Sequence, residues 1–292
     1  MNPRISLIAG ILCISFSPIF VKLADASPLT SRFYRIFLAW ICLLPYCLAK
    51  ENLKIGRRQL LAAITGGIVF AMDIAVWNLS LIKISATVST LIANLAPVWV
   101  GLISFFILKK KSGGLFWTGT VVAIVGMIIL VGYQHLLSLQ FNVGIPLALL
   151  ASMLYAVYIV ITRDVLQKIS TVTFMFYNML AGSILLLIVN LLMKNEMIRL
   201  PVRDWLCFAG MGILCQLAGW LTINHSLRSL ESAKVSIALL SQTVIAGFLA
   251  IWFLSETLEL NEIIGSAIVL AGIAVTFLRQ RKPRSGQIQS GT

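Results

Sequence analysis

Residues 85–108 read SATVSTLIANLAPVWVGLISFFIL, and no side chain in this stretch is charged. A helix rises about 1.5 Å per residue, so about 20 predominantly apolar residues cross the hydrocarbon core of a bilayer. Nine other stretches share this length and apolar character: 5–23, 31–49, 60–81, 114–132, 143–162, 172–193, 204–227, 233–254 and 261–278. The sequence therefore predicts ten transmembrane helices joined by short connections.

The composition excludes a soluble domain. Hydrophobic residues make up 59% of the 292 residues and charged residues 11%, and the mean hydropathy is +0.97. A soluble protein of this size needs a polar surface around its core. Backbone groups in hydrocarbon must bond within their own segment, and the alternating pattern of barrel strands does not occur, so we expect an all-α integral membrane protein. No cleavage pattern follows the first apolar stretch, which is therefore expected to be a membrane span and not a signal peptide.

The formal net charge of +13 is explained by membrane topology, and a nucleic-acid partner is not expected. With the N-terminus inside, 16 of the 23 lysines and arginines lie on the inner side and 7 on the outer side. The positive-inside rule then places both termini in the cytoplasm. We expect a multi-pass protein of the cell membrane, in a bacterial inner membrane, with a basic and polar cytoplasmic tail at 279–292.

The two halves of the sequence resemble each other at a separation of 146 residues. Matching pairs are Asn78 with Asn224, Ser80 with Ser226, Gly101 with Gly247, Gly119 with Gly265 and Gly126 with Gly272. The predicted repeats are 5–132 and 143–278, with five helices each. An odd helix count gives the repeats opposite orientations, an arrangement typical of secondary transporters with a midplane site. The paired glycines of the fifth and tenth helices are expected to permit close helix packing.

Short motifs add a family resemblance. They are SPIFVK at 17–22, RIFLA at 35–39, WN at 77–78, ATVSTLIANLAPV at 86–98 and LSE at 254–256. With them, the stretch 5–278 resembles the drug/metabolite transporter superfamily, specifically its EamA-type ten-helix members. The resemblance implies a cavity between helices 1–4 and 6–9, a small organic substrate such as an amino acid, and export. Thr243 stands where Pro97 stands in the first repeat, so helix 9 is expected to be less kinked than helix 4.

Asp73 is the acid that lies well inside a predicted span, and its counterpart at the same separation is Gly219. An isolated carboxylate at that depth costs at least about 2–3 kcal/mol and normally faces the bundle interior or water. Trp77, four residues on, shares its helix face. Asp73 is therefore predicted to carry protons or to bind a cationic or amino group, and the alternative is an acid held by a structural arginine or asparagine.

Arg32 and Arg35 lie on one face of the second predicted helix, near its outer end. Together with Lys22 they could attract an anionic group such as a carboxylate. For Lys22 and Arg32 the favoured alternative is snorkelling to lipid headgroups. Arg35 lies about one turn deeper, and binding and structural roles remain equally open for it.

Other polar and aromatic residues could line the same space. Asn78 and Asn224 recur in both repeats and are interpreted first as interhelical hydrogen-bond partners, with cavity lining as the alternative. Gln216, Trp220 and Asn224 form a stripe at four-residue spacing, and His225 beside it is either proton-coupling or structural. The remaining candidates are Asn94, Tyr155, Tyr158 and Gln242. Membrane-interface positions are the alternative for the aromatic residues.

The expected function is secondary transport of a small organic metabolite, such as an amino acid, by alternating access. No Walker A motif occurs, so ATP hydrolysis is not expected. Protons are one coupling ion considered, and a gradient-independent facilitator is the alternative. An intramembrane enzyme is disfavoured because no paired membrane aspartates, His–Glu motif or Gly-x-Ser-x-Gly elbow occurs, and a non-transporting scaffold needs no inverted repeats. No catalytic residue, cofactor or metal is expected, since the five cysteines lack metal-ligand spacing. A homodimer is left open.

Overall fold

The computed structural model describes residues 2–51, 53–81, 83–84, 86–107, 109, 113–131, 143–254 and 260–278. Eight helical segments in these ranges are long and apolar enough to cross a membrane, and two shorter apolar helices take the places of the fourth and fifth predicted spans. The described residues thus form an all-helical membrane fold. The predicted tail at 279–292 and the Ser255–Glu256 end of helix 9 lie outside them.

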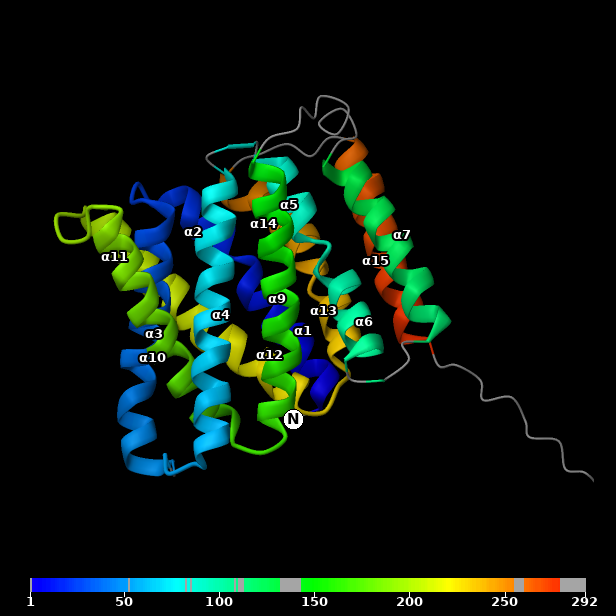
Figure 1. The fold of residues 1–292 in the computed structure, drawn as a ribbon. Coiled ribbons are helices and arrows are strands. Elements are labelled where there is room, and N and C mark those ends of the chain that lie inside the picture. The colour runs from blue at the N-terminus through cyan, green and yellow to red at the C-terminus, as the bar shows by residue number, and fades with distance from the viewer. Residues whose placement is uncertain are drawn as a thin grey trace, which may run out of the picture.

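Figure 1 shows how the helices are arranged. The N-terminal part contains α1 (Pro3–Ser15), α2 (Ser17–Leu23), α3 (Pro28–Lys50), α4 (Arg57–Leu81), α5 (Ala86–Ala93), α6 (Ala96–Phe106) and α7 (Gly114–Val131). The C-terminal part contains α9 (Gly144–Leu166), α10 (Thr171–Leu192), α11 (Val202–Gly210), the π-helix η1 (Met211–Gly219), α12 (Trp220–Leu227), α13 (Ser232–Ala238), α14 (Ser241–Leu254) and α15 (Leu260–Phe277).

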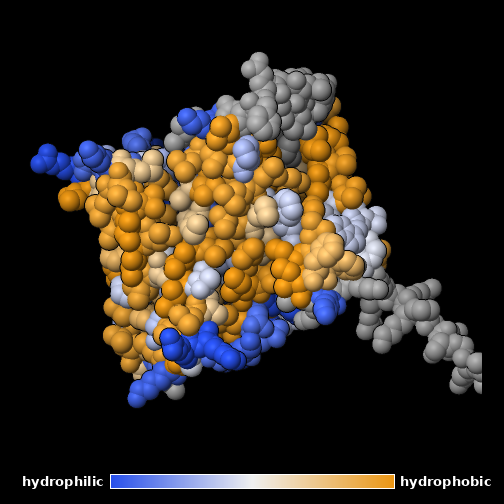
Figure 2. Space-filling model, in the orientation of Figure 1, coloured by the Kyte–Doolittle hydropathy of each residue, from blue (hydrophilic) through white to orange (hydrophobic). Residues whose placement is uncertain are grey.

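The outer surface of the bundle is apolar. On the face drawn in Figure 2, hydrophobic residues form a broad band, and hydrophilic residues gather toward the two ends. Large apolar side chains such as Phe106 and Trp252 are 71% and 85% exposed. A surface of this kind would drive aggregation in water, but it matches the hydrocarbon of a bilayer.

Several of the predicted spans are interrupted helices. The stretch 85–108 is divided into α5 and α6 just before Pro97, which lacks a backbone N–H and cannot extend the preceding helix. The prediction that helix 9 would be less kinked is not confirmed, because α13 ends at Ala238 and α14 begins only at Ser241. Tight bonds from Leu240 N to Ile237 O and from Gln242 N to Leu239 O cross this junction without a proline.

The predicted helix 204–227 is continuous but changes its winding. Its middle part is η1, a π-helix of 9 residues that includes Gln216. A π turn contains more residues than an α turn, so it changes which side chains on either side of it share a face. Such segments occur often at functional sites.

Helix packing follows a regular scheme of pairs. Helix α4 packs against α9 and α10, while α1 packs against α12 and η1. Helix α3 packs against α10 and η1, and α7 packs most extensively against α15. Figure 1 shows α7 and α15 side by side at one edge of the bundle.

The glycines of α7 and α15 bring the two backbones into contact, as the sequence predicted. A Cβ atom on Gly272 would lie 2.5 Å from Ala123 N and 2.7 Å from Gly119 O. On Gly126 it would lie 2.6 Å from Val269 N. No side chain longer than hydrogen fits at these points, so the close packing prediction is confirmed.

The beginning of α3 is bound to the connection that follows α10. Ser27 caps α3 by accepting the Thr30 N–H at 3.1 Å. The Thr30 hydroxyl donates to the Glu196 carbonyl at 3.1 Å, and the Tyr34 hydroxyl donates to the Met197 carbonyl at 2.6 Å. We call this set of contacts the Tyr34 latch.

The beginning of α10 is bound in the same way to the connection that follows α3. Ser170 caps α10 by accepting the Thr173 N–H at 3.0 Å, and both hydroxyls donate to Glu51 Oε2. The Tyr177 hydroxyl donates to the Leu53 carbonyl at 2.7 Å. This second set, the Tyr177 latch, lies at the opposite end of the pair, so α3 and α10 run antiparallel.

Replacing Gly272 by valine should lower the free energy of unfolding by about 1–3 kcal/mol, because the added side chain meets backbone atoms that cannot move aside. Thermal unfolding of the detergent-purified protein measures the loss. Gly114→Val is the matched control, since a Cβ at Gly114 has no heavy atom within 4 Å. Equal losses in both variants would contradict the proposed basis of the α7–α15 contact.

Candidate functional site

Arg32 of α3 lies over the ring of Trp77 on α4, with its Cζ atom 5.8 Å from the ring centroid. Asp73 lies one helical turn before Trp77 and interacts electrostatically with Arg32. All three side chains are half-buried. The structure therefore places Arg32 beside Trp77 and Asp73, not at the lipid headgroups where the sequence suggested it.

Arg35, one turn further along α3, is only 5% exposed and is held by two neutral groups. Its Nε donates to Gln216 Oε1 at 3.0 Å and its Nη1 donates to Ser17 Oγ at 2.8 Å. These bonds tie α3 to α2 and to η1. Arg35 is thus fixed in the scaffold, and its charge faces Tyr155 on α9.

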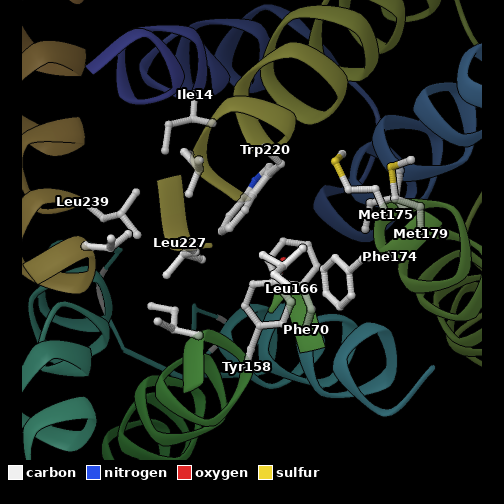
Figure 3. Packing of buried hydrophobic residues seen from close by; sticks show 14 of the residues in the cluster. Ile14, Phe70, Tyr158, Leu166, Phe174, Met175, Met179, Trp220, Leu227 and Leu239 are labelled. Carbon is white, nitrogen blue, oxygen red and sulfur yellow. The ribbon is translucent and has the colours of Figure 1, made fainter. Parts of the chain in front are cut away.

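An aromatic group borders these polar residues. Phe70 of α4 lies 4.7 Å from the ring of Tyr158 and 5.2 Å from that of Trp220, measured between ring centroids. Tyr158 and Trp220 are 5.6 Å apart, and Tyr155 lies 6.4 Å from Trp220. Figure 3 shows Phe70, Tyr158 and Trp220 converging from α4, α9 and α12. Tyr155 also interacts with Asp73, which joins the aromatic and charged residues into one cluster.

The two repeated asparagines differ in their contacts. Asn224 lies beside the Tyr158 hydroxyl and thus makes the expected contact between helices. Asn78 instead donates from Nδ2 to the Ile74 carbonyl of its own helix at 2.8 Å. In the described part of the chain, the Oδ1 atoms of both Asn78 and Asn224 are buried without a hydrogen-bond partner.

Two predicted site residues lie at the helix breaks and not in this cluster. Asn94 lies between α5 and α6, and Gln242 lies in the first turn of α14. Both are half-buried, and among the described residues no hydrogen bond joins either side chain to the cluster. The part of the chain that the structure describes contains no group of three or more His, Cys, Asp or Glu side chains able to hold a metal ion.

Sequence reasoning missed Phe70 and Ser17 as members of the site, and for Arg32 it favoured the lipid headgroups over anion binding. A signal for Arg32 exists, because the pattern S-x-x-T-x-x-F-Y begins at both Ser27 and Ser170, 143 residues apart. At this separation Met175 is the counterpart of Arg32 and Asn178 that of Arg35. Both arginines are therefore specific to the first repeat, the same asymmetry that singled out Asp73. No comparable signal marks Ser17 or Phe70.

The apolar exterior, the interrupted helices and the interior cluster of charged and aromatic side chains define a multi-pass membrane transporter. A family model described as the EamA-like transporter family matches residues 4–132 and 142–278. The chain belongs to this family, an EamA-type branch of the drug/metabolite transporters, and is a transporter rather than an enzyme. Its setting is a membrane and its substrate is a small molecule.

Known proteins similar to this chain are named as transporters. One from Archaeoglobus fulgidus, named an uncharacterized transporter, is 24% identical and aligns with 89% of this chain and 90% of its own. Another, the uncharacterized transporter YdfC of Bacillus subtilis, is 19% identical over 95% of this chain and 90% of its own. An S-adenosylmethionine uptake transporter of Rickettsia prowazekii is 25% identical over 50% of this chain and 49% of its own. A crystal structure matches the fold with a TM-score of 0.80 and 17% identity, covering 94% of this chain and 96% of that chain.

Replacing Gln216 by leucine should lower the free energy of unfolding by about 1–3 kcal/mol, because the buried Arg35 guanidinium loses an acceptor. Thermal unfolding in detergent measures this. Gln167→Leu serves as the control, since Gln167 is exposed at the end of α9. If the Gln216 variant were as stable as the control, the Arg35–Gln216 bond would not be a significant part of the scaffold.

Proposed function

We propose that the protein is a secondary transporter that exports a small organic metabolite, such as an amino acid, by alternating access. The observation that carries this proposal is the half-buried cluster of Arg32, Asp73, Trp77 and Tyr155, contributed by α3, α4 and α9. Ionisable groups inside a membrane protein are costly and normally mark the path of a substrate or ion. Aromatic side chains beside them supply apolar contact for the rest of a solute.

An inverted repeat is supported by the way in which helices pair. When the two repeats are exchanged, α4 corresponds to the span of η1 and α12, and α9 corresponds to α1. The contact of α4 with α9 therefore has its equivalent in the contact of η1 and α12 with α1. The α3–α10 and α7–α15 pairs are their own equivalents. The Tyr34 and Tyr177 latches obey the same exchange, since matching residues bind at opposite ends of the α3–α10 pair.

Interrupted helices at equivalent places also favour transport. The break between α5 and α6 and the break between α13 and α14 lie near equivalent positions of the two repeats. Discontinuous helices in transporters provide free backbone groups for substrates and ions, and local points at which a helix can bend. Rocking of the two repeats about such points would open the cluster first to one side and then to the other.

S-adenosylmethionine is a second candidate substrate. The Rickettsia prowazekii relative carries this compound in its name, and its name states uptake and not export. The molecule is an amino acid that carries an additional sulfonium cation. Aromatic faces such as those of Trp77 and Trp220 attract cations, and Asp73 adds a negative charge.

Transport by purified protein in proteoliposomes tests the proposed function, with labelled amino acids, S-adenosylmethionine and other metabolites offered with and without a pH gradient. We expect saturable uptake that the gradient accelerates in the wild type but not in Asp73→Asn, because the amide cannot carry the proton. Uptake that ignores the gradient would indicate a facilitator. If correctly inserted protein moved none of these solutes, the transport proposal would be wrong.

The inverted arrangement predicts that the two latches face opposite sides of the membrane. In a cysteine-free background, Arg199→Cys should react with an impermeant maleimide in intact cells, because the connection after α10 faces outward. Arg58→Cys, at the start of α4, should react only after the cells are permeabilised. Labelling of both sites from the same side would contradict the inverted repeat.

A further inference from the structure

We propose that Arg32 and Asp73 are the two ends of a binding site for a zwitterion, in which Arg32 binds the carboxylate of the substrate and Asp73 binds its ammonium group. The inference rests on the proposed transport function and names the substrate class: amino acids with an apolar or aromatic side chain. It assigns substrate binding to Arg32 and separates it from Arg35, one turn away.

The two arginines of α3 differ in how their donors are used. Arg35 donates to Gln216 and Ser17 and is almost fully buried, so its position is fixed by the protein itself. The Arg32 guanidinium, by contrast, makes no hydrogen bond to any described residue and lies over the face of Trp77, with its Cζ atom 5.8 Å from the ring centroid. A guanidinium has several N–H donors arranged to bind a carboxylate through two parallel bonds. Arg32 is therefore the arginine free to bind an anionic group.

Asp73 is in the complementary situation. Its carboxylate accepts no hydrogen bond from the described part of the chain, and no direct ion pair joins it to Arg32. Opposite charges that lie in an apolar bundle without a direct ion pair or hydrogen bond are each short of a partner. A ligand that carries an ammonium group for Asp73 and a carboxylate for Arg32 would satisfy both charges at once. A neutral ligand, or one of a single charge, would leave at least one of them unpaired.

Neighbouring side chains suit the remainder of an amino acid. The Trp77 Nε1–H is buried without an acceptor, close to Arg32, and provides a further donor for a carboxylate. Tyr155 interacts with Asp73, its ring lies 6.4 Å from that of Trp220, and Trp220 in turn lies 5.2 Å from Phe70. A substrate side chain that extends from the charged residues toward these rings would meet an aromatic surface. The geometry thus favours apolar and aromatic side chains over charged ones.

Two sets of probes, each sharing one carbon skeleton, test the inference on the full-length purified protein. They are L-leucine, isopentylamine and 4-methylpentanoate, and L-phenylalanine, phenethylamine and 3-phenylpropionate. Binding is measured as ligand-dependent thermal stabilisation, and transport as competition in proteoliposomes. In the wild type we expect at least one amino acid to bind about tenfold more tightly than its amine and its acid, because each analogue leaves one charge unpaired.

The variants should separate binding of the carboxylate by Arg32 from binding of the ammonium group by Asp73. Arg32→Gln should weaken binding of the amino acid and of the acid by about ten- to hundredfold and leave the amine unchanged. Asp73→Asn should weaken binding of the amino acid and of the amine, and leave binding of the acid unchanged. Arg32→Lys, which keeps the charge without the paired donors, should restore part of the affinity. Arg199→Gln, on the connection after α10, is the control and should resemble the wild type.

The outcomes distinguish this inference from the proposed function. Suppose that the wild type moves an amino acid, but Arg32→Gln and Asp73→Asn weaken binding of the amino acid, the amine and the acid alike. The zwitterion site is then wrong, and the proposed transport function still holds. If the wild type binds and moves none of the solutes, both proposals fall. Should the neutral variants not fold, Arg32→Lys and Asp73→Glu supply the same comparison with charge retained, and an unchanged preference among the three probes in both would overturn the assignment.

Discussion

The position of α3 depends on the hydrogen bonds that the buried, charged side chain of Arg35 makes inside a bundle surrounded by lipid. A buried guanidinium needs acceptors from its own protein, since hydrocarbon supplies none. Arg35 obtains them from Ser17 and from Gln216, which joins α2, α3 and the π-helical part of the eighth span. With both ends of α3 bound through the latches, this central bond fixes its rotation. The same rotation then directs Arg32, one turn earlier, toward α4 and Asp73.

Much of the fold could be predicted from the sequence, because the length of an apolar stretch reports a membrane span directly. Spacing on a helix also placed Arg32 with Arg35, and Gln216 with Trp220 and Asn224, on shared faces. Hydrophobic periodicity did not give the inward direction of Arg32, since lipid and protein interior are equally apolar; the mismatch with Met175 was its one sequence signal. The break before Ser241 has no proline to announce it, and the π-helix has no simple sequence signature.

The two repeats use equivalent positions for different purposes. Asp73 lies in the charged cluster, whereas its counterpart Gly219 brings α1 against η1, where an added Cβ would lie 2.7 Å from Ile14 Cγ2. The first repeat thus has a carboxylate at the position where the second repeat has a close contact between helices. The two latches, by contrast, use matching residues of the two halves, and the α7–α15 contact joins the halves through matching glycines.

The contact between α7 and α15 also has a consequence for biogenesis. Helix α7 enters the membrane during synthesis long before its main partner exists. At about 5–20 residues per second, the ~146 residues that separate equivalent points of the two helices take roughly 7–30 s to make. Throughout that interval the glycine face of α7 is open to lipid or to the insertion machinery. Helix α15, synthesised long after α7, therefore completes this contact, and a chain truncated before residue 260 would leave α7 without the helix that covers it.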